Sequence, residues 1–257
     1  MDRQVAAPSE GKVRAGKVVG NTAMATDLPG ALAGERRLEV VGPLAPLLSG
    51  GGLRRGSTVV VVSAGAPGAT TLALALVSGT SQRGSWCAVV GVPEIGLVAA
   101  SQMGLKLERL ALVAHPGAQW STVVATLLDS MDAVVVRPPA RLAAADARRL
   151  AARARERGSV AVILGAGWPE GADVRLSVHT AAWSGLGTGH GHLQARLVEV
   201  VATGRGAATR ERRARVWLPG PTGAVAPFDD QAGRPRVEAE ERFASSEPGL
   251  AWVGRVG

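Results

Sequence analysis

One stretch, residues 59–74, constrains the fold of this 257-residue chain more than any other. It begins with four consecutive valines, passes through the turn Ser-Ala-Gly-Ala-Pro-Gly, and opens into an apolar segment with helical spacing. β-Branched runs favour strands, and glycine and proline favour tight turns. The sequence therefore predicts a buried strand, a turn and a helix, which is the repeating unit of parallel α/β sheets.

The turn has the outline of a phosphate-binding loop, whose pattern is G-x-x-x-x-G-K-[ST]. In such a loop, backbone N–H groups and the positive end of the helix hold the phosphates. Ser63 stands in place of the first glycine, and Ala69 stands in place of the lysine. We interpret the loop as a vestigial phosphate site that no longer supports hydrolysis, made of Ser63, Gly65, Gly68, Ala69, Thr70 and Thr71. Residual nucleotide binding through backbone N–H groups stays open, as does a plain turn without a ligand.

Composition limits the class of protein. A net charge of +8 and a pI near 11.1 indicate an acidic partner, either nucleic acid or an acidic protein surface. The single cysteine, Cys87, lies in an apolar run and is expected to be a buried thiol in a reducing compartment. No signal peptide and no apolar run long enough to span a bilayer is visible, so we expect a soluble cytoplasmic protein without membrane contact.

The order of patterns predicts an α/β core with two tails. We expect a flexible tail over residues 1–34, a core over 35–220 and a second flexible tail over 221–257. A short edge strand is predicted at 38–41, followed by strands alternating with helices: strands 57–63, 86–92, 110–114, 133–136 and 160–164, and helices 70–82, 94–103, 119–130 and 140–157. Such alternation is typical of a mostly parallel sheet with helices on both faces.

After residue 171 the apolar period changes to two. This predicts antiparallel strands that extend the sheet, around residues 174–180, 195–201 and 214–218. A glycine-rich loop over 184–192 and a basic turn over 204–213 are expected to join them.

In this order the chain resembles the RecA family core over roughly residues 36–220. The entry Gly52-Leu53-Arg54-Arg55-Gly56, the turn and helix 63–76, and the strand 132–137 match the lead-in, the P-loop and the Walker B strand of that family. Glu94 falls near the position of the family's catalytic glutamate. The resemblance implies a RecA-like P-loop core.

The chain also departs from that family at several positions. Ala69 removes the phosphate-binding lysine, and Arg137 stands where an Asp should help to hold Mg²⁺. Residues 165–172 are too few for the long DNA-binding loop, and residues 1–34 do not have the pattern of a polymerising helix. Phosphoryl transfer depends on those electrostatics, so we expect a pseudo-ATPase with no catalytic residues.

Within the RecA family the chain is most similar to the actinobacterial ImuA-prime type, an accessory of the damage-inducible mutasome. This resemblance implies a non-catalytic adaptor in translesion synthesis and induced mutagenesis, with an ImuB-like protein and an error-prone DNA polymerase assembly as partners. Two alternatives stay open: a divergent ATPase with an unusual P-loop, and an SOS-type inhibitor of cell division.

Partner contacts are expected at two places. Trp252, Arg255 and Phe243 lie in the predicted C-terminal tail, where aromatic and arginine side chains are favoured anchors. Arg210, Arg212 and Arg213 form a basic cluster without the interleaved aromatic residues of a single-strand binder, so DNA and acidic protein are both open. The arginines of helix 140–157 are expected on a solvated face opposite a stripe of Leu142, Ala145 and Leu150. His179, His190 and His192, three of the four histidines, are not expected to bind a metal.

Overall fold

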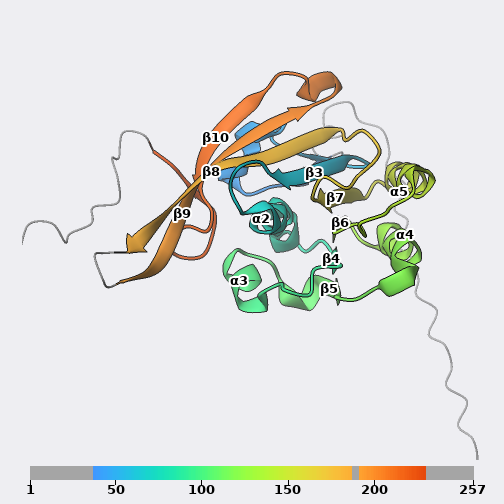
Figure 1. The fold of residues 1–257 in the computed structure, drawn as a ribbon, viewed down its shortest axis with the longest axis horizontal. Helices are drawn as coiled ribbons and strands as arrows, with labels where there is room; N and C mark the ends of the chain where they lie inside the picture. Colours follow the sequence, from blue (N-terminus) through green and yellow to red (C-terminus); the bar gives the residue numbers. More distant parts are fainter. Residues whose placement is uncertain (1–36, 187–190, 230–257) are drawn as a thin grey trace, which may run out of the picture.

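The computed structural model describes residues 37–186 and 191–229. Within these residues a nine-stranded sheet has the order β11-β10-β9-β8-β3-β7-β6-β4-β5 (Figure 1). Its strands are β3 (Thr58–Ser63), β4 (Cys87–Val90), β5 (Leu110–Val113), β6 (Ala133–Val136), β7 (Val160–Leu164), β8 (Val174–Leu186), β9 (Gly191–Gly204), β10 (Arg212–Trp217) and β11 (Ala226–Pro227).

The middle of the sheet is parallel, and its inner strands are mostly buried. β3 lies between β7 and β8 and is parallel to both, and β7, β6, β4 and β5 continue the parallel run. The four residues of β4 and the four of β6 are all buried, as expected for strands covered on both faces. The predicted parallel α/β core is confirmed at this level.

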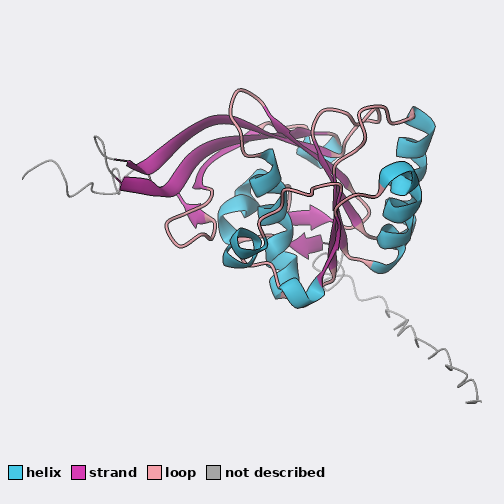
Figure 2. Ribbon diagram, turned by 60° about the horizontal axis from the view of Figure 1, so that its bottom comes forward, coloured by secondary structure: helices cyan, strands magenta, loops and turns pink. Residues whose placement is uncertain are grey.

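The other end of the sheet is antiparallel. β8 pairs with β9, β9 with β10, and β10 with β11, each in antiparallel register. This part carries the sheet away from the helices as a long twisted ribbon (Figure 2). The period-two pattern therefore predicted the direction of these strands correctly.

Helices cover the two faces of the parallel region (Figures 1 and 2). On one face, α2 (Ala69–Gln82) and α3 (Leu97–Gln102) belong to a core cluster with Val59 and Val61 of β3. On the other face, α4 (Trp120–Ser130) and α5 (Ala144–Arg157) pack in a cluster with Val60. Alternate residues of β3 thus face different helical layers, which is the period of a strand. Four 3₁₀ helices complete the described elements: η1 (Gly42–Leu47), η2 (Leu107–Arg109), η3 (Gly117–Gln119) and η4 (Gly206–Ala208).

Several predicted boundaries are wrong. The strand near residue 38 is β1 (Arg37–Glu39), and it pairs with β2 (Gly52–Arg54) in a separate two-stranded sheet rather than at the edge of the main one. Of the predicted glycine-rich loop 184–192, residues 184–186 belong to β8 and residues 191–192 belong to β9, and residues 187–190 lie outside the described residues. The predicted tail from residue 221 begins with an ordered turn and β11, which pairs with Val216 and Trp217.

Two helices are shorter than predicted. α3 begins at Leu97, three residues after Glu94, and α5 begins at Ala144 rather than 140. The buried stripe of α5 is Ala147, Leu150, Ala151 and Ala154. Ala145, predicted to face the sheet, is exposed. Leu142 precedes the helix but packs, as predicted, against the core cluster that contains Leu150. None of the described helices combines the length and apolarity needed to cross a bilayer.

Candidate functional site

The turn between β3 and α2 leaves the first N–H groups of the helix free of side-chain caps. Gly68 precedes α2 with φ of 138°, and its carbonyl accepts the N–H of Leu72 at 2.9 Å. No side chain caps this end, and the first turn of α2 contains no acidic residue. The positive end of a 14-residue helix therefore faces the turn without a neutralising carboxylate of its own.

Arg137 lies directly against this helix end. Its Nη2 donates to the Oγ1 of Thr70 at 3.3 Å, and its Nη1 forms an ion pair with the carboxylate of Glu94. One guanidinium thus joins the hydroxyl at the start of α2 to the only acidic side chain that lines the neighbouring cavities. A positive charge held at this hydroxyl repels a divalent cation.

The backbone around Arg137 fixes this position. Arg137 follows β6, its N–H donates to the carbonyl of Val90 at 2.9 Å, and its carbonyl accepts the indole N–H of Trp120 at 2.9 Å. Glu94 lies in the turn after β4, and β4 and β6 are neighbours in the sheet. Both residues are therefore placed at the carboxyl ends of adjacent parallel strands, where α/β proteins bind ligands.

The electrostatics of Glu94 reflect this contact. A hydrogen bond from its own backbone N–H, and then the hydrogen bond from Arg137, hold the pKa of the Glu94 carboxyl below its ordinary value. Glu94 is therefore ionised and paired near neutral pH. A paired carboxylate is a poor general base, since the proton it would accept competes with the guanidinium.

A second guanidinium reaches the turn from the antiparallel strands. Arg196 of β9 is 5% exposed; its Nε donates to the carbonyl of Leu218 at 2.9 Å and its Nη1 to the carbonyl of Pro67 at 3.2 Å. Its Nη2 is buried and has no hydrogen-bond partner among the described residues. Burial lowers the pKa of this guanidinium from its ordinary value. The ring of Trp183 lies over it, with the guanidinium carbon 5.2 Å from the ring centroid.

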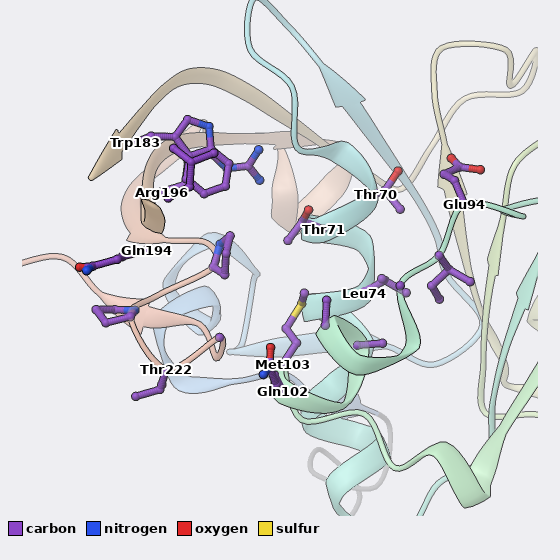
Figure 3. A pocket seen from close by; sticks show the side chains of 18 residues that line it. Thr70, Thr71, Leu74, Glu94, Gln102, Met103, Trp183, Gln194, Arg196 and Thr222 are labelled. Atoms are coloured by element: carbon purple, nitrogen blue, oxygen red, sulfur yellow. The ribbon is translucent and has the colours of Figure 1, made fainter. Parts of the chain in front are cut away.

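Two cavities of about 710 Å³ each meet at this point. One is lined by the turn, Arg137 and Arg196; the other lies between the start of α2, α3, the β8–β9 ribbon and the loop after β10. Figure 3 shows the second cavity, with the guanidinium of Arg196 pointing from β9 toward Thr71. Much of its wall is apolar, including Leu74, Met103 and Leu193.

The structure brings together some of the predicted site residues. Ser63, Gly68, Ala69, Thr70 and Thr71 all line the cavity at the turn. Gly65 does not line it and turns the chain with φ of 96°. The predicted loop is thus a real concave surface, whose cations come from Arg137 and Arg196.

The predicted basic cluster lies elsewhere. Arg212 and Arg213 are the first two residues of β10. The opposite end of β10 is followed by Leu218, whose carbonyl accepts a hydrogen bond from Arg196. Arg213 pairs with Glu211 at 2.8 Å and Glu199 at 3.8 Å, and Arg210 is exposed in the preceding turn. The predicted anchors Phe243, Trp252 and Arg255 lie outside the described residues.

Most arginines of α5 form ion pairs within the chain. Arg153 and Arg157 both bind Asp129 of α4, Arg149 pairs with Asp146, and Arg148 pairs with Glu170. The expected solvated face therefore includes ion pairs that join α5 to α4.

The predicted group of histidines is described only in part. His179 of β8 lies 2.9 Å from the hydroxyl of Ser177, and His190 is outside the described residues.

Sequence reasoning missed Arg196. The buried row of β9 is Arg196, Val198, Val200 and Ala202, whereas the sequence pattern was read on the alternate positions from Ala195 to Val201. The sequence did contain a signal, because Arg196 alternates with Val198 and Val200 and so falls on the same face of the strand. A cation on a buried face requires partners, which marks it as a candidate site residue.

Comparisons with known proteins place the chain in a family. Residues 46–170 match the family described as the MT3502 N-terminal domain. The chain is 35% identical over 149 residues to Rv3395c of Mycobacterium tuberculosis (strain ATCC 25618 / H37Rv), described as an uncharacterized protein. This similarity covers 54% of the chain and 72% of that relative. The chain belongs to the MT3502 N-terminal domain family. The part that matches this family includes Thr70, Glu94 and Arg137, and it ends before Arg196.

Proposed function

We propose that this member of the MT3502 N-terminal domain family is a catalytically inactive, RecA-like adaptor in DNA-damage-induced translesion synthesis and mutagenesis. In this proposal it acts in the cytoplasm by contacts with an ImuB-like protein and an error-prone polymerase assembly. It neither hydrolyses nucleotide nor needs a metal.

One observation carries the inactive part of the proposal: Arg137 binds both the Thr70 hydroxyl and the Glu94 carboxylate. Phosphoryl transfer by P-loop proteins requires a metal ion on the loop hydroxyl, a lysine on the phosphates and a group that orients the nucleophile. Here Arg137 donates a hydrogen bond to the Thr70 hydroxyl and forms an ion pair with the Glu94 carboxylate. Ala69 stands in place of the lysine. These three features lie in one place and support a site without phosphoryl transfer.

The topology supports the RecA-like part. The first strand of the parallel run, β3, leads through the glycine turn into α2, and antiparallel strands β9 and β10 follow the parallel core on one side. The connection between β7 and β8 contains only residues 165–173, so the parallel core lacks room there for a long DNA-gripping loop. A protein with this core and no long loop there is suited to contacts with other proteins.

The test is capture of named partners from cells with damaged DNA. A tagged full chain should retain the ImuB-like protein and the error-prone polymerase, as identified by mass spectrometry, and should not do so in undamaged cells where these proteins are not induced. The partner-contact variant Phe243→Ala with Trp252→Ala should lose both, while the matched variant Trp86→Ala should keep them, since Trp86 is exposed on the core.

Two outcomes would reject the proposal. The adaptor assignment fails if neither partner is retained by the full chain after damage. The pseudo-ATPase assignment fails if the purified chain hydrolyses ATP and the Arg137→Ala variant differs from it in rate, because Arg137 would then act in turnover.

A further inference from the structure

The unpartnered Nη2 of Arg196 is the strongest unexplained group in the described residues. A buried guanidinium N–H without an acceptor is unfavourable, because the lost hydration is not replaced. It lies in the wall shared by both cavities and beside the uncapped end of α2. A built Cβ on Gly68 would be 2.8 Å from Nη2, so the group lies tightly against the turn. The natural acceptor for such a group is a carboxylate.

The cavity beside Arg196 also exposes apolar surface. Trp183 is 44% exposed and Leu193 is 50% exposed, and both line the cavity together with Leu74 and Met103. The one carboxylate that lines it, Glu94, is already paired with Arg137. The cavity thus fits an occupant that carries both a negative charge and an aromatic or aliphatic side chain.

The chain contains such an occupant beyond its described residues. Residues 238–243 read Glu-Ala-Glu-Glu-Arg-Phe, with three carboxylates and one aromatic ring. Gly223 lines the cavity, and Asp229 is the last described residue, six positions later. The six positions from Gly223 to Asp229 set the greatest distance by which the chain can leave the cavity. The nine positions from Asp229 to Glu238 can span more than this distance, at about 3.3–3.6 Å per residue. Segment 238–243 can therefore return to the cavity.

We propose that segment 238–243 docks in this cavity of its own chain. A glutamate carboxylate of the segment accepts the free N–H of Arg196, and the ring of Phe243 lies against the apolar wall near Met103 and Leu193. The docked segment covers Trp183 and the start of α2. Phe243 is also one of the partner contacts proposed above, so docking and partner binding exclude each other at this ring. Docking involves one chain alone, and a test on the purified chain can fail without the adaptor proposal failing.

A spin-label experiment on the purified full chain tests the docking. Ala244→Cys carries a nitroxide next to Phe243, and Cys87 is buried and stays unlabelled. The chain has six tryptophans, which 5-fluorotryptophan makes visible by ¹⁹F NMR. Trp183 reports the cavity, Trp217 reports the root of the tail beside β11, and Trp120 packs on the opposite face of the sheet.

The expected result is selective broadening of the Trp183 signal, with the Trp120 signal unchanged. In the variant Glu238→Gln, Glu240→Gln and Glu241→Gln, the tether length is the same but the charge is gone. The docking equilibrium constant should fall about tenfold or more, since hydrogen bonds to charged groups are worth roughly 1.4 kcal/mol or more, and each 1.4 kcal/mol is a factor of ten. The broadening of Trp217 should change little.

Variants of Arg196 give a second readout. Arg196→Gln should reduce the broadening of Trp183, and Arg196→Lys should retain part of it. If Arg196→Gln fails to fold, the glutamine variant of residues 238, 240 and 241 still tests the docking, because it changes no residue of the described core. The proposal is overturned if the Trp183 signal is not broadened in the full chain, or if the glutamine variant broadens it equally.

Discussion

The Nη2 of Arg137 lies 3.3 Å from the hydroxyl oxygen of Thr70, across 67 positions of sequence. The contact arises because the turn before α2 and the end of β6 open onto the same edge of the sheet. The opposite side of the same guanidinium pairs with Glu94. A cation supplied by the protein therefore lies between two oxygen groups that would otherwise suit a metal ion.

This arrangement predicts that one substitution converts the site into a weak metal site. In Arg137→Asp, a carboxylate would join the Thr70 hydroxyl and a released Glu94, and these oxygen ligands suit Mg²⁺ and Mn²⁺. Mn²⁺ binding, measured by electron paramagnetic resonance, should appear in this variant and be weaker in Arg137→Ala. Equal Mn²⁺ binding by the unmodified chain would contradict the assigned role of Arg137.

The local patterns predicted much of the fold because they are short-range. The valine run of β3, its glycine turn and the apolar stripe of α2 are each encoded within a few residues, and all three were placed within one residue of the observed bounds. The long β8–β9 ribbon was only partly predicted. The ends of the two strands near its tip are strand because they pair across the ribbon, as Ser184 does with Ala195 and Leu186 with Gly191, and such pairing overrides local propensity.

The candidate site was predicted in part for a related reason. The turn and its missing lysine can be seen in the sequence, but the contact of Arg137 with Glu94 depends on β4 and β6 being neighbours. β11 was missed because it is an Ala-Pro pair whose strand geometry comes from the edge position beside β10, where proline is tolerated. Both features are set by the order of the strands, which the sequence pattern does not specify.

The ion pairs of Asp129 predict a pH-dependent stability difference. Hydrogen bonds and charge from Arg153, and then Arg157, hold the pKa of the Asp129 carboxyl below its ordinary value of 3.8. The ionised, paired form therefore adds stability above the unfolded-state pKa, and this is lost as the pH falls through the folded-state pKa. Asp129→Asn should lower Tm by about 1–4 °C at pH 7. Thermal scans should show this difference shrinking below pH 4, with Glu108→Gln, an exposed carboxylate of η2 away from α4 and α5, as a control that shows no such difference.

Burial predicts an unreactive thiol at Cys87. Burial, with a smaller effect of the Asp132 charge, raises the pKa of Cys87 to about 12. The thiolate is the reactive form, so iodoacetamide should modify the folded chain slowly at pH 8 and the urea-unfolded chain rapidly. Mass spectrometry of the adduct measures both rates. Rapid modification in native buffer would show that β4 opens far more readily than its complete burial implies.

The geometry of Gly68 predicts a backbone-dependent loss of stability. Its φ of 138° is unfavourable for any residue with a Cβ, and a Cβ there would lie 2.8 Å from Nη2 of Arg196. Gly68→Ala should therefore lower the free energy of unfolding by about 1–3 kcal/mol, as measured by urea denaturation. Gly167→Ala, in the same cavity wall but with nothing within 4 Å of its Cβ, is the matched control and should change it by less than about 0.5 kcal/mol. Equal losses in the two variants would mean that the turn can relax, and that the close approach of Arg196 does not restrict it.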